Sequence, residues 1–378
     1  MRSAAPLPRN PLKPAVVYVS RRYPPSVGGM QRLAGELHLA LSARVPVRAA
    51  LWGGGQALLP LFGLAAALRV AAWLARPSAW ARRHGEVLLA GDALLAPLGL
   101  LLGRLFGRPV ACVAHGLDVT YPHPLYRWLV PPALRRMDVV VAISQRTRAL
   151  VLEQGVAPDR CVVVRPGVEP EPLPPRELAR KRLSARLGAE LADRPVLATV
   201  CRLVPRKGVA WFAEEVMPRL AERCPGALYV HLGDGPERAA LERFAGPRVR
   251  LLGRAADDVR ADLYAAADLF VMPYRARVGD VEGFGLVAAE AMLAGLPVVA
   301  TAVDAVPEVV RDGVGGRLVP PEDPAALADA ILSLLSDPDA RRRLGEGARA
   351  EAEARFGWSR VGDDYLAAVA GARRGARA

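Results

Sequence analysis

The sequence predicts an α/β protein made of two similar halves, each built on a parallel β-sheet. Short apolar runs, glycine-bearing turns and helical patterns follow one another along the chain, which is typical of buried parallel strands joined by helices. The order strand, glycine loop, helix begins at residues 15–20 and restarts at residues 195–200. A length of 378 residues suits two domains with a large buried core.

A change of composition marks the boundary between the halves. Prolines at positions 170, 172, 174 and 175 give way to a charged stretch that runs to Leu191. We therefore predict an N-terminal domain over 1–172 and a C-terminal domain over 173–355. The expected strands are 15–20, 87–90, 110–114, 138–144, 161–165, 195–200, 228–232, 249–253, 269–273 and 298–301, and the expected helices include 31–41, 209–224, 286–293 and 324–352.

The charge balance indicates an anionic partner. The formal net charge is +13 and the pI is about 10.3, and nearly all of the positive charge is arginine. We find no basic patch with spaced aromatics, no zinc-ligand spacing and no heptad array, so nucleic acid is not the expected partner. Phosphorylated substrates or an anionic membrane surface fit the charge better.

The cysteines and the apolar segments indicate the cellular compartment in which the protein is expected to work. The four cysteines are scattered through apolar runs, which predicts reduced thiols in the cytoplasm, and no signal peptide is recognised at the start. Segments 53–68 and 93–103 fall short of the roughly 20 apolar residues that a spanning helix needs. Residues 58–83, with Trp73, Trp80 and several arginines, fit either a helix lying on the inner face of a membrane or a core helix.

The stretch 281–300 carries the strongest site signal. Gly283 and Gly285 disfavour helix, whereas 286–293 is rich in helix formers, so a helix begins just after a glycine loop. Such a start leaves backbone N–H groups without partners and carries the positive end of the helix dipole. We therefore predict that Gly285, Leu286 and Val287 hold a phosphate.

Two glutamates flank this helix start. Glu290 lies one turn inside the helix, and because a carboxylate repels phosphate, it is better suited to accept hydrogen bonds from ribose hydroxyls. Glu282, in the loop, is placed to do the same for a sugar. The plainer reading is two solvated glutamates, but their position after an expected strand, where ligands of parallel sheets bind, favours a site.

A second loop contributes cations. Arg202 and Lys207 flank a turn at the end of strand 195–200, where two positive charges can neutralise a diphosphate. Strand 228–232 leads into Gly233, but a dinucleotide-binding fingerprint fails because Arg238 stands where the third glycine belongs.

The N-terminal half supplies its own candidates. Gly28 and Gly29 open a helix, so the backbone there can approach a phosphate or a sugar closely. His115 follows a strand and precedes a glycine, which fits either a side chain that points into a cleft or a partly exposed loop histidine. Ser144 is positioned to cap the next helix.

Together, these motifs resemble the retaining nucleotide-sugar glycosyltransferases of family 4, in the GT-B superfamily of two facing Rossmann-like domains with an interdomain cleft. The likeness covers nearly the whole chain, and the set is specific in order and spacing. The matching pieces are Gly28-Gly29, residues 115–118, residues 166–169, residues 202–208, residues 233–236, and Glu282 with Glu290 around Gly283-Phe284-Gly285.

The resemblance implies transfer of a hexose, such as mannose, glucose or N-acetylglucosamine, from a nucleoside diphosphate sugar to a glycan or lipid-linked acceptor. It implies retention by front-face attack, with no metal or other cofactor, and Arg202 and Lys207 take the metal's electrostatic role. Glu290 then holds the ribose, Glu282 the donor hexose and His115 the sugar near the reacting carbon. Gly28, Gly29, Gly233, Gly285, Leu286 and Val287 line the donor, and Asp118 and Ser144 contact the acceptor.

The resemblance also implies that the last helix, within 356–378, returns to the N-terminal domain. The chain departs from the family at Cys201, where glycine is common, and at Asp304-Ala305, which replace a glycine pair beside the donor sugar. The alternatives are a nucleotide-sugar epimerase or a sugar phosphorylase of the same fold, and a non-catalytic nucleotide-sugar binding subunit. A phosphorylase needs a cofactor-bearing lysine, and Lys207 is already assigned to phosphate.

Overall fold

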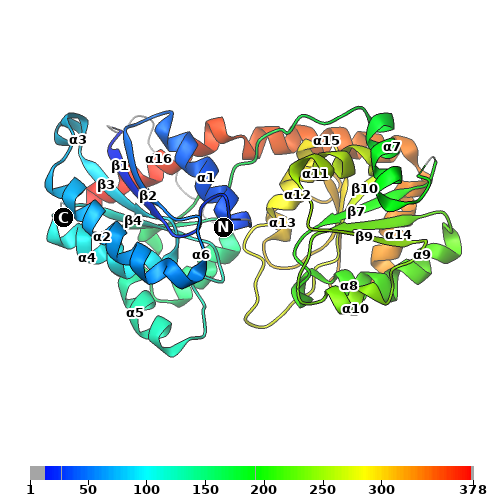
Figure 1. Cartoon of the computed structure of the whole chain (residues 1–378), viewed down its shortest axis with the longest axis horizontal. Helices are drawn as coiled ribbons and strands as arrows, with labels where there is room; N and C mark the ends of the chain where they lie inside the picture. The colour runs from blue at the N-terminus through cyan, green and yellow to red at the C-terminus, as the bar shows by residue number, and fades with distance from the viewer. Residues whose placement is uncertain (1–12, 27, 192, 376–378) are drawn as a thin grey trace. The chain divides into compact units, whose positions relative to one another are not determined.

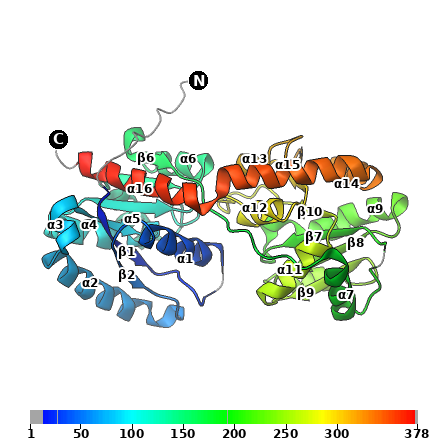
Figure 2. The same ribbon diagram turned by 90° about the horizontal axis from the view of Figure 1, so that it is seen from above.

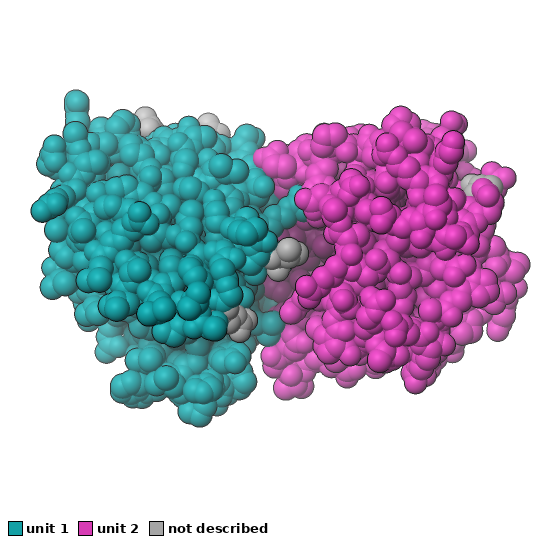
Figure 3. Space-filling view, viewed as in Figure 1, with its two compact units in different colours: residues 1–167, 358–378 teal, residues 168–357 magenta. Residues whose placement is uncertain are grey.

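The computed structural model describes residues 13–26, 28–191 and 193–375 and divides into two compact units. The N-terminal unit runs to Gly167 and also contains Trp358 and the residues that follow it, and the C-terminal unit is Val168–Gly357. Figure 1 shows the chain from blue to red, and Figure 3 colours the units teal and magenta. The sequence placed the boundary at residue 172, in a segment without helix or regular strand that ends at Pro175.

The N-terminal unit is built on six parallel strands in the order β2-β1-β3-β4-β5-β6. Every residue of β1, β3, β4 and β5 is buried, which is why these strands read as apolar runs apart from Ser20 at the end of β1 and Glu86 at the start of β3. The strands are β1 (Ala15–Ser20), β2 (Val47–Leu51), β3 (Glu86–Ala90), β4 (Val110–Ala114), β5 (Val139–Ala142) and β6 (Cys161–Val163).

Helices cover both faces of this sheet, with α1 and α16 on one side and α2, α4 and α5 on the other (Figures 1 and 2). The last helix, α16, packs against α1 and against β3, β4 and β5. Arg44 ties the two helices together, because its Nε donates to Asp363 at 3.1 Å. The helices are α1 (Gly29–Ser42), α2 (Leu59–Ala75), α3 (Ala79–His84), α4 (Ala96–Leu105), α5 (Pro124–Leu134), α6 (Gln145–Glu153) and α16 (Trp358–Gly375). Among the described helices, none combines the length and the apolar character that crossing a membrane requires.

The C-terminal unit carries six parallel strands in the order β12-β11-β10-β7-β8-β9. The chain order reverses between β7 and β10, so the loops that follow these two strands flank the topological switch point where ligands of such sheets bind. The strands are β7 (Val196–Val200), β8 (Leu228–Leu232), β9 (Val249–Gly253), β10 (Leu269–Met272), β11 (Val298–Thr301) and β12 (Gly316–Val319). The helices are α7 (Arg176–Leu187), α8 (Val209–Trp211), α9 (Met217–Arg223), α10 (Arg238–Glu242), α11 (Asp257–Ala266), α12 (Leu286–Leu293), α13 (Val306–Val309), α14 (Pro324–Ser336) and α15 (Pro338–Phe356), with a π-helical segment at Phe212–Val216.

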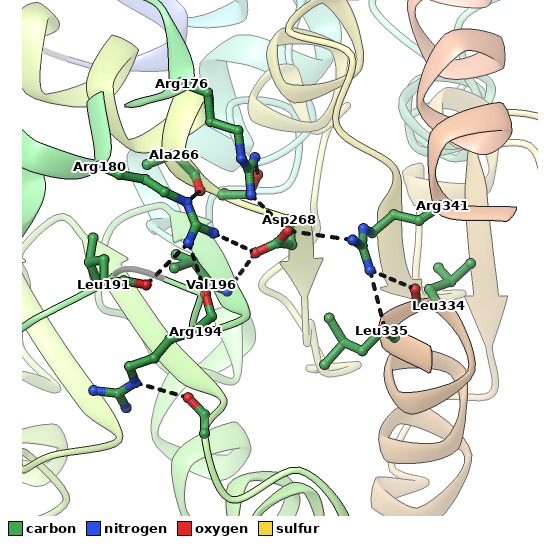
Figure 4. A network of polar contacts seen from close by, with 12 residues as sticks. Arg176, Arg180, Leu191, Arg194, Val196, Ala266, Asp268, Leu334, Leu335 and Arg341 are labelled. Carbon is green, nitrogen blue, oxygen red and sulfur yellow. Dashed lines mark hydrogen bonds and ion pairs between the residues drawn. The ribbon is translucent and has the colours of Figure 1, made fainter. Parts of the chain in front are cut away.

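A carboxylate network fixes the opposite, amino-terminal edge of this sheet (Figure 4). Asp268, just before β10, accepts from the backbone N–H of Val196 at 2.8 Å, which aligns β10 with β7. Arg176 and Arg180 of α7 donate to the same carboxylate at 2.8 and 2.9 Å, and Arg341 of α15 lies 3.8 Å away.

The predicted fold class is confirmed, and each predicted strand is present with small shifts of its ends. The edge strands β2 and β12 were not predicted, because β2 contains Arg48 and β12 contains the exposed Arg317, so neither reads as an apolar run. The helix predicted over 286–293 is α12, with the same bounds. All four cysteines are free thiols, as expected.

Candidate active site

The loop after β7 brings two cations onto one carboxylate of the loop after β10. Lys207 is buried, and its Nζ donates to Oε2 of Glu282 at 2.5 Å. The Arg206 guanidinium donates to the same oxygen, and its Nε donates to Asp280 at 2.8 Å. The ammonium of Lys207 also lies 3.9 Å from the centre of the Tyr274 ring, a cation–π contact. We call Arg206, Lys207 and Glu282 the ion cluster.

The ion cluster keeps Glu282 ionised. Burial alone raises the pKa of this carboxyl, but the charges and hydrogen bonds of Lys207 and Arg206 outweigh burial and lower it below its usual value. Burial of the ammonium lowers the pKa of Lys207, against the opposing pull of Glu282. An ion pair of this kind depends on both partners, since removing either leaves an uncompensated buried charge.

Only one oxygen of Glu282 is used by the two cations. Both bonds reach Oε2, and within the described residues Oε1 has no hydrogen-bond partner and is not among the fully buried atoms. The backbone N–H of Glu282 donates to Asp304 Oδ2 at 3.0 Å. Asp304, which replaces a glycine of the family that the sequence resembles, thus supplies a carboxylate that supports the Glu282 loop.

Arg202 lies apart from the ion cluster. The sequence grouped it with Lys207, but Arg202 is exposed and contacts no carboxylate in the part of the chain that the structure describes. Sequence reasoning instead missed Arg206, whose place in the pair Arg206-Lys207 directly before Gly208 was the available signal. Arg202 is therefore a charge open to a ligand, whereas Arg206 and Lys207 are already paired.

Glycines let the carboxyl-end loops touch backbone to backbone. A Cβ on Gly208 would lie 1.9 Å from the carbonyl oxygen of Pro273, and one on Gly233 would lie 1.9 Å from that of Cys201. Both glycines also have positive φ, which side-chain-bearing residues rarely adopt. Gly233, predicted to line the donor, thus has a packing role that its sequence context did not reveal.

Helix α12 starts beside the ion cluster's loop, as the glycine pattern predicted. Gly285 precedes it with φ of 96°, no side chain caps the helix and no acidic residue lies in its first turn. Leu286 and Val287 are half-buried at this helix start. The backbone N–H groups and the positive dipole end suit an anionic group here.

Glu290 lies one turn further on and lines a pocket with Tyr264 of α11. The Tyr264 hydroxyl donates to Glu290 Oε2 at 3.2 Å. Glu169, from the Pro166–Glu169 motif, lines the same pocket, together with Glu171, Leu173, Leu293 and Ala294. Three carboxylates line this small pocket of about 10 Å³, and one of them, Glu171, is paired with Arg260 of α11. The sequence did not single out Tyr264.

In the N-terminal unit, the loops after β1, β3 and β4 meet at the carboxyl edge of the sheet. The chain order reverses between β1 and β3, which makes this the unit's switch point. Gly28 and Gly29 lie here at the start of α1, where no side chain caps the helix. Arg21 donates from Nε to the fully buried Asp92 at 3.0 Å, a pair that sequence reasoning missed. Burial raises the pKa of Asp92, and Arg21 opposes that shift.

His115 is oriented by backbone contacts. Its Nε2 lies 2.8 Å from the carbonyl oxygen of Gly91. Because a carbonyl only accepts, Nε2 carries the proton in this contact, which leaves Nδ1 of the neutral ring as an acceptor. Asp118 is buried and binds two loops, accepting from the N–H of His115 at 2.8 Å and from that of Ala93 at 3.0 Å.

The geometry disfavours the two predicted acceptor contacts. Ser144 is fully buried, and its Oγ accepts from the N–H of Thr147 at 2.9 Å, which confirms the predicted helix cap. Both oxygens of Asp118 are used by backbone N–H groups. These side chains shape the loops of the unit, because buried polar groups are held by the partners they satisfy.

Two family models cover most of the chain. Residues 27–172 match the model described as Glycosyltransferase Family 4, and residues 194–337 match the model described as Glycosyl transferases group 1. The first match falls on the N-terminal unit and runs a few residues beyond Gly167, and the second lies within the C-terminal unit.

Relatives of known activity align over most of their length. A GDP-mannose-dependent alpha-(1-6)-phosphatidylinositol monomannoside mannosyltransferase of Mycobacterium tuberculosis is 31% identical over 373 residues, covering 91% of this chain and 94% of that protein. The enzyme of the same description from Mycolicibacterium smegmatis is 34% identical over 304 residues, covering 77% of each chain. A D-inositol 3-phosphate glycosyltransferase of Xylanimonas cellulosilytica is 37% identical over 255 residues, covering 63% of this chain and 58% of that protein.

Solved structures share the fold. Sucrose-phosphate synthase from Thermosynechococcus elongatus superposes with a TM-score of 0.73 at 22% identity, covering 93% of this chain and 97% of that one. Anabaena HepE in complex with UDP and glucose gives a TM-score of 0.71 at 20% identity, with the same coverage.

Proposed function

The chain belongs to glycosyltransferase family 4, and on this premise we propose that it transfers mannose from GDP-mannose to a lipid-linked acceptor, with retention at the anomeric carbon. Transfer of a sugar from a nucleotide sugar follows from the family. The choice of donor, acceptor and stereochemistry is the proposal.

The observation that carries the proposal is the ion cluster beside the start of α12. Departure of a nucleoside diphosphate builds negative charge, and cations fixed in advance stabilise that change without reorganising. Lys207 and Arg206 are fixed by Glu282, and Arg202 stands exposed on the same loop. Helix α12 adds backbone N–H groups at Gly285, Leu286 and Val287 for the same diphosphate.

The two glutamates then bind the uncharged parts of the donor, which are the hexose and the ribose. Glu282 is anchored through Oε2, so Oε1 can accept a hydroxyl of the hexose. Glu290, one turn inside α12 and bonded to Tyr264, is assigned to the ribose hydroxyls. Asp304, at a position where the family commonly has glycine, accepts from the backbone N–H of Glu282 and so supports this loop.

In the N-terminal unit, His115 contacts the sugar near the reacting carbon and the Gly28-Gly29 loop meets the phosphate or the acceptor. The Nε2–H contact with Gly91 holds the imidazole in one orientation. No carboxylate base is assigned to the acceptor hydroxyl. The leaving phosphate accepts that proton in front-face attack, which yields retention.

Metal independence is part of the proposal. Arg202, together with Arg206 and Lys207 of the same loop, is assigned the positive charge that a divalent ion supplies elsewhere, and Glu282 and Asp280 balance two of these charges in the free protein. A chelator is therefore expected to leave transfer unchanged.

Donor and acceptor follow the relatives' printed activities. Two of those named above use GDP-mannose and act on a phosphatidylinositol mannoside, and a third acts on D-inositol 3-phosphate. All are transferases, so the epimerase and phosphorylase alternatives gain no support. We place the reaction at the cytoplasmic face of a membrane, where four free thiols stay reduced and a lipid-linked acceptor is present.

The test has two steps. Thermal unfolding with GDP, UDP, ADP and their mannose or glucose conjugates measures donor choice, because a ligand that binds only the folded state raises the melting temperature. Transfer of labelled mannose from GDP-mannose is then followed into a lipid extract and into free inositol phosphate, with and without EDTA.

We expect the largest shift with GDP-mannose and label in the lipid fraction. A larger shift with UDP or ADP conjugates would overturn the donor, and label only in the water-soluble fraction would overturn the acceptor. Binding without transfer to either fraction would favour the non-catalytic binder.

A further inference from the structure

Among the residues that the structure describes, two that bear side chains have a left-handed backbone, Asp304 with φ of 48° and Glu322 with φ of 59°. Such residues rarely adopt these angles, and the strain persists only where the surrounding structure imposes it. Asp304 follows β11 and Glu322 follows β12, so both lie at the carboxyl edge of the C-terminal sheet. The strained positions are therefore on the edge that also carries the ion cluster.

Both strained residues bond to one loop, residues 275–282, which follows β10 and ends at Glu282. At the start of this loop, Nε of Arg275 donates to the two carboxylate oxygens of Glu322 at 2.9 and 2.7 Å. At its end, the backbone N–H of Glu282 donates to Asp304. Because two residues from different loops are both strained and both bond to this loop, we infer that the strain serves to hold the loop in place.

The backbone at Asp304 is kept in its conformation by buried neighbours. Val303, Ala305 and Val306 are buried, and the N–H of Val306 donates to the carbonyl oxygen of Val303 at 3.0 Å, which closes a turn around Asp304. A relaxed φ at Asp304 would reopen this turn. Glycine, which the family commonly has at this position, would adopt the same φ without strain but would offer no acceptor. This chain therefore carries a strained carboxylate where the family commonly has neither.

Glu282 is thereby fixed at its backbone as well as at its carboxylate. Its N–H is bonded to Asp304, and its Oε2 is bonded to Lys207 and Arg206. With both ends held, the other carboxylate oxygen, Oε1, is restricted to one direction instead of the several that free rotamers would allow. A group that is ordered in advance binds a ligand at a lower entropic cost.

We propose that Asp304 is a positioning residue for the donor sugar: by holding the N–H of Glu282, it directs Oε1 of Glu282 toward a hydroxyl of the bound hexose. This inference rests on the proposed function, which assigns Glu282 to the hexose, and it adds the residue that orients that contact. Asp304 acts through Glu282 and not on the diphosphate. Its loss therefore weakens the binding of the sugar and leaves the binding of the nucleotide unchanged.

Three variants separate the acceptor, its charge and the backbone strain. D304G removes the acceptor but relieves the strained φ, so its melting temperature should stay within about two degrees of the parent's. D304N loses the charge but keeps an amide oxygen that accepts from an N–H, and asparagine tolerates this backbone region. The matched control is D312G, which removes another carboxylate–backbone bond of the C-terminal unit, from the N–H of Leu318 to the exposed Asp312 at 2.9 Å.

Calorimetric titration with GDP and with GDP-mannose measures the contribution of the sugar as the ratio of the two Kd values, and steady-state kinetics give kcat/KM for transfer. We expect D304G to bind GDP within about twofold of the parent, to bind GDP-mannose about fivefold more weakly and to lose about 30-fold in kcat/KM. D304N should recover kcat/KM to within about threefold of the parent, since the acceptor is restored. D312G should match the parent in every binding and kinetic measurement.

Full activity of D304G, or an equal loss of affinity for GDP and for GDP-mannose, would overturn the inference. A D304G chain that melts far below the parent would also overturn it, because Asp304 would then serve stability and not the sugar. Failure of the proposed function gives a different result: a parent chain that prefers another nucleoside diphosphate hexose contradicts the proposed donor. The same ratio is then measured with that conjugate and its bare nucleotide, so the role of Asp304 is tested in either case.

Discussion

The two units share a parallel six-stranded sheet but differ in how they treat charge and apolar surface. The C-terminal unit buries Lys207 against Glu282 and ties its loops with ion pairs. The N-terminal unit orients His115 and Asp118 through backbone hydrogen bonds, and it contains one buried ion pair in its loops, Arg21–Asp92. Of the sixteen large apolar side chains that are exposed in the described chain, thirteen belong to the N-terminal unit.

This difference separates two tasks that one fold can perform. A charged ligand such as a diphosphate needs cations held in place before it binds, and burial with a carboxylate partner fixes them. Exposed apolar side chains, which gather on the N-terminal unit, take no part in such charge pairing. Both units have the same kind of sheet and the same kind of carboxyl-end loops. The residues on those loops and on the helices therefore determine what each unit can bind.

The largest loss of activity is expected from removing a cation of the C-terminal unit. The variant K207Q removes the ammonium that contacts Glu282 and Tyr274, and we expect kcat/KM for transfer to fall about 10³-fold because the leaving diphosphate loses a fixed charge. K181Q, at an exposed position of α7, is the control and should keep full activity. Steady-state kinetics measure both, and a K207Q enzyme within threefold of the parent would contradict the role of the ion cluster.

A smaller effect is expected from the N-terminal unit's imidazole. H115A should lower kcat about 100-fold while the KM for donor changes little, because this side chain acts near the reacting carbon and not on the nucleotide. The exposed His123 provides the control H123A, which should be indistinguishable from the parent. An H115A enzyme that loses donor binding and not kcat would place His115 in the donor site instead.

Asp118 tests the claim that the N-terminal unit relies on backbone-directed bonds. In D118N one of the two carboxylate oxygens becomes an amide nitrogen, which cannot accept from the N–H groups of His115 and Ala93 at once. The free energy of unfolding should fall by about 2 kcal/mol, measured by urea titration.

Loss of one helix cap in S144A should cost about 1 kcal/mol and leave transfer within twofold. A large loss of acceptor affinity in S144A, with stability kept, would restore the acceptor role that the geometry disfavours.

The smallest effect concerns acid stability of the C-terminal unit. The pKa of Glu282 is below its ordinary value of 4.5, so the unfolded chain takes up a proton at higher pH than the folded chain does. The stabilisation from Glu282 is therefore complete above about pH 4.5 and is lost as pH falls through the lowered folded value. Urea midpoints of the parent and of E282Q should converge as the pH is lowered from neutrality below 4.5. A gap that stays constant over this range would contradict the ion pairing.

Much of the fold could be predicted from the sequence, because the local pattern of apolar residues and glycines agreed with the tertiary structure. Buried strands such as β4 gave continuous apolar runs, and glycines around Phe284 set the start of α12 at Leu286. The edge strands β2 and β12 were not predicted, because their residues are largely half-buried and each strand contains an arginine that interrupts the apolar run. Edge position is a property of the assembled sheet, so local sequence does not encode it plainly.

The site was predictable in part for a related reason. Lys207 and Glu282 were identified from their loops, but their direct contact depends on the adjacency of β7 and β10, which the chain order alone does not give. The pairs Arg206–Glu282 and Arg21–Asp92 were missed because each joins residues more than 70 positions apart. The exposed side of α2 was equally hidden, since periodicity shows that a helix is apolar but not which side is covered.

The most direct test of the account is calorimetric titration of the intact chain with GDP in the presence of EDTA. If the cation loop of the C-terminal unit holds the diphosphate, GDP binds without a metal, and R202Q, which removes an exposed and unpaired charge, binds about tenfold more weakly. If binding appears only when Mg²⁺ is added, or if R202Q and K207Q bind GDP as the parent does, the diphosphate is held elsewhere and the central claim fails.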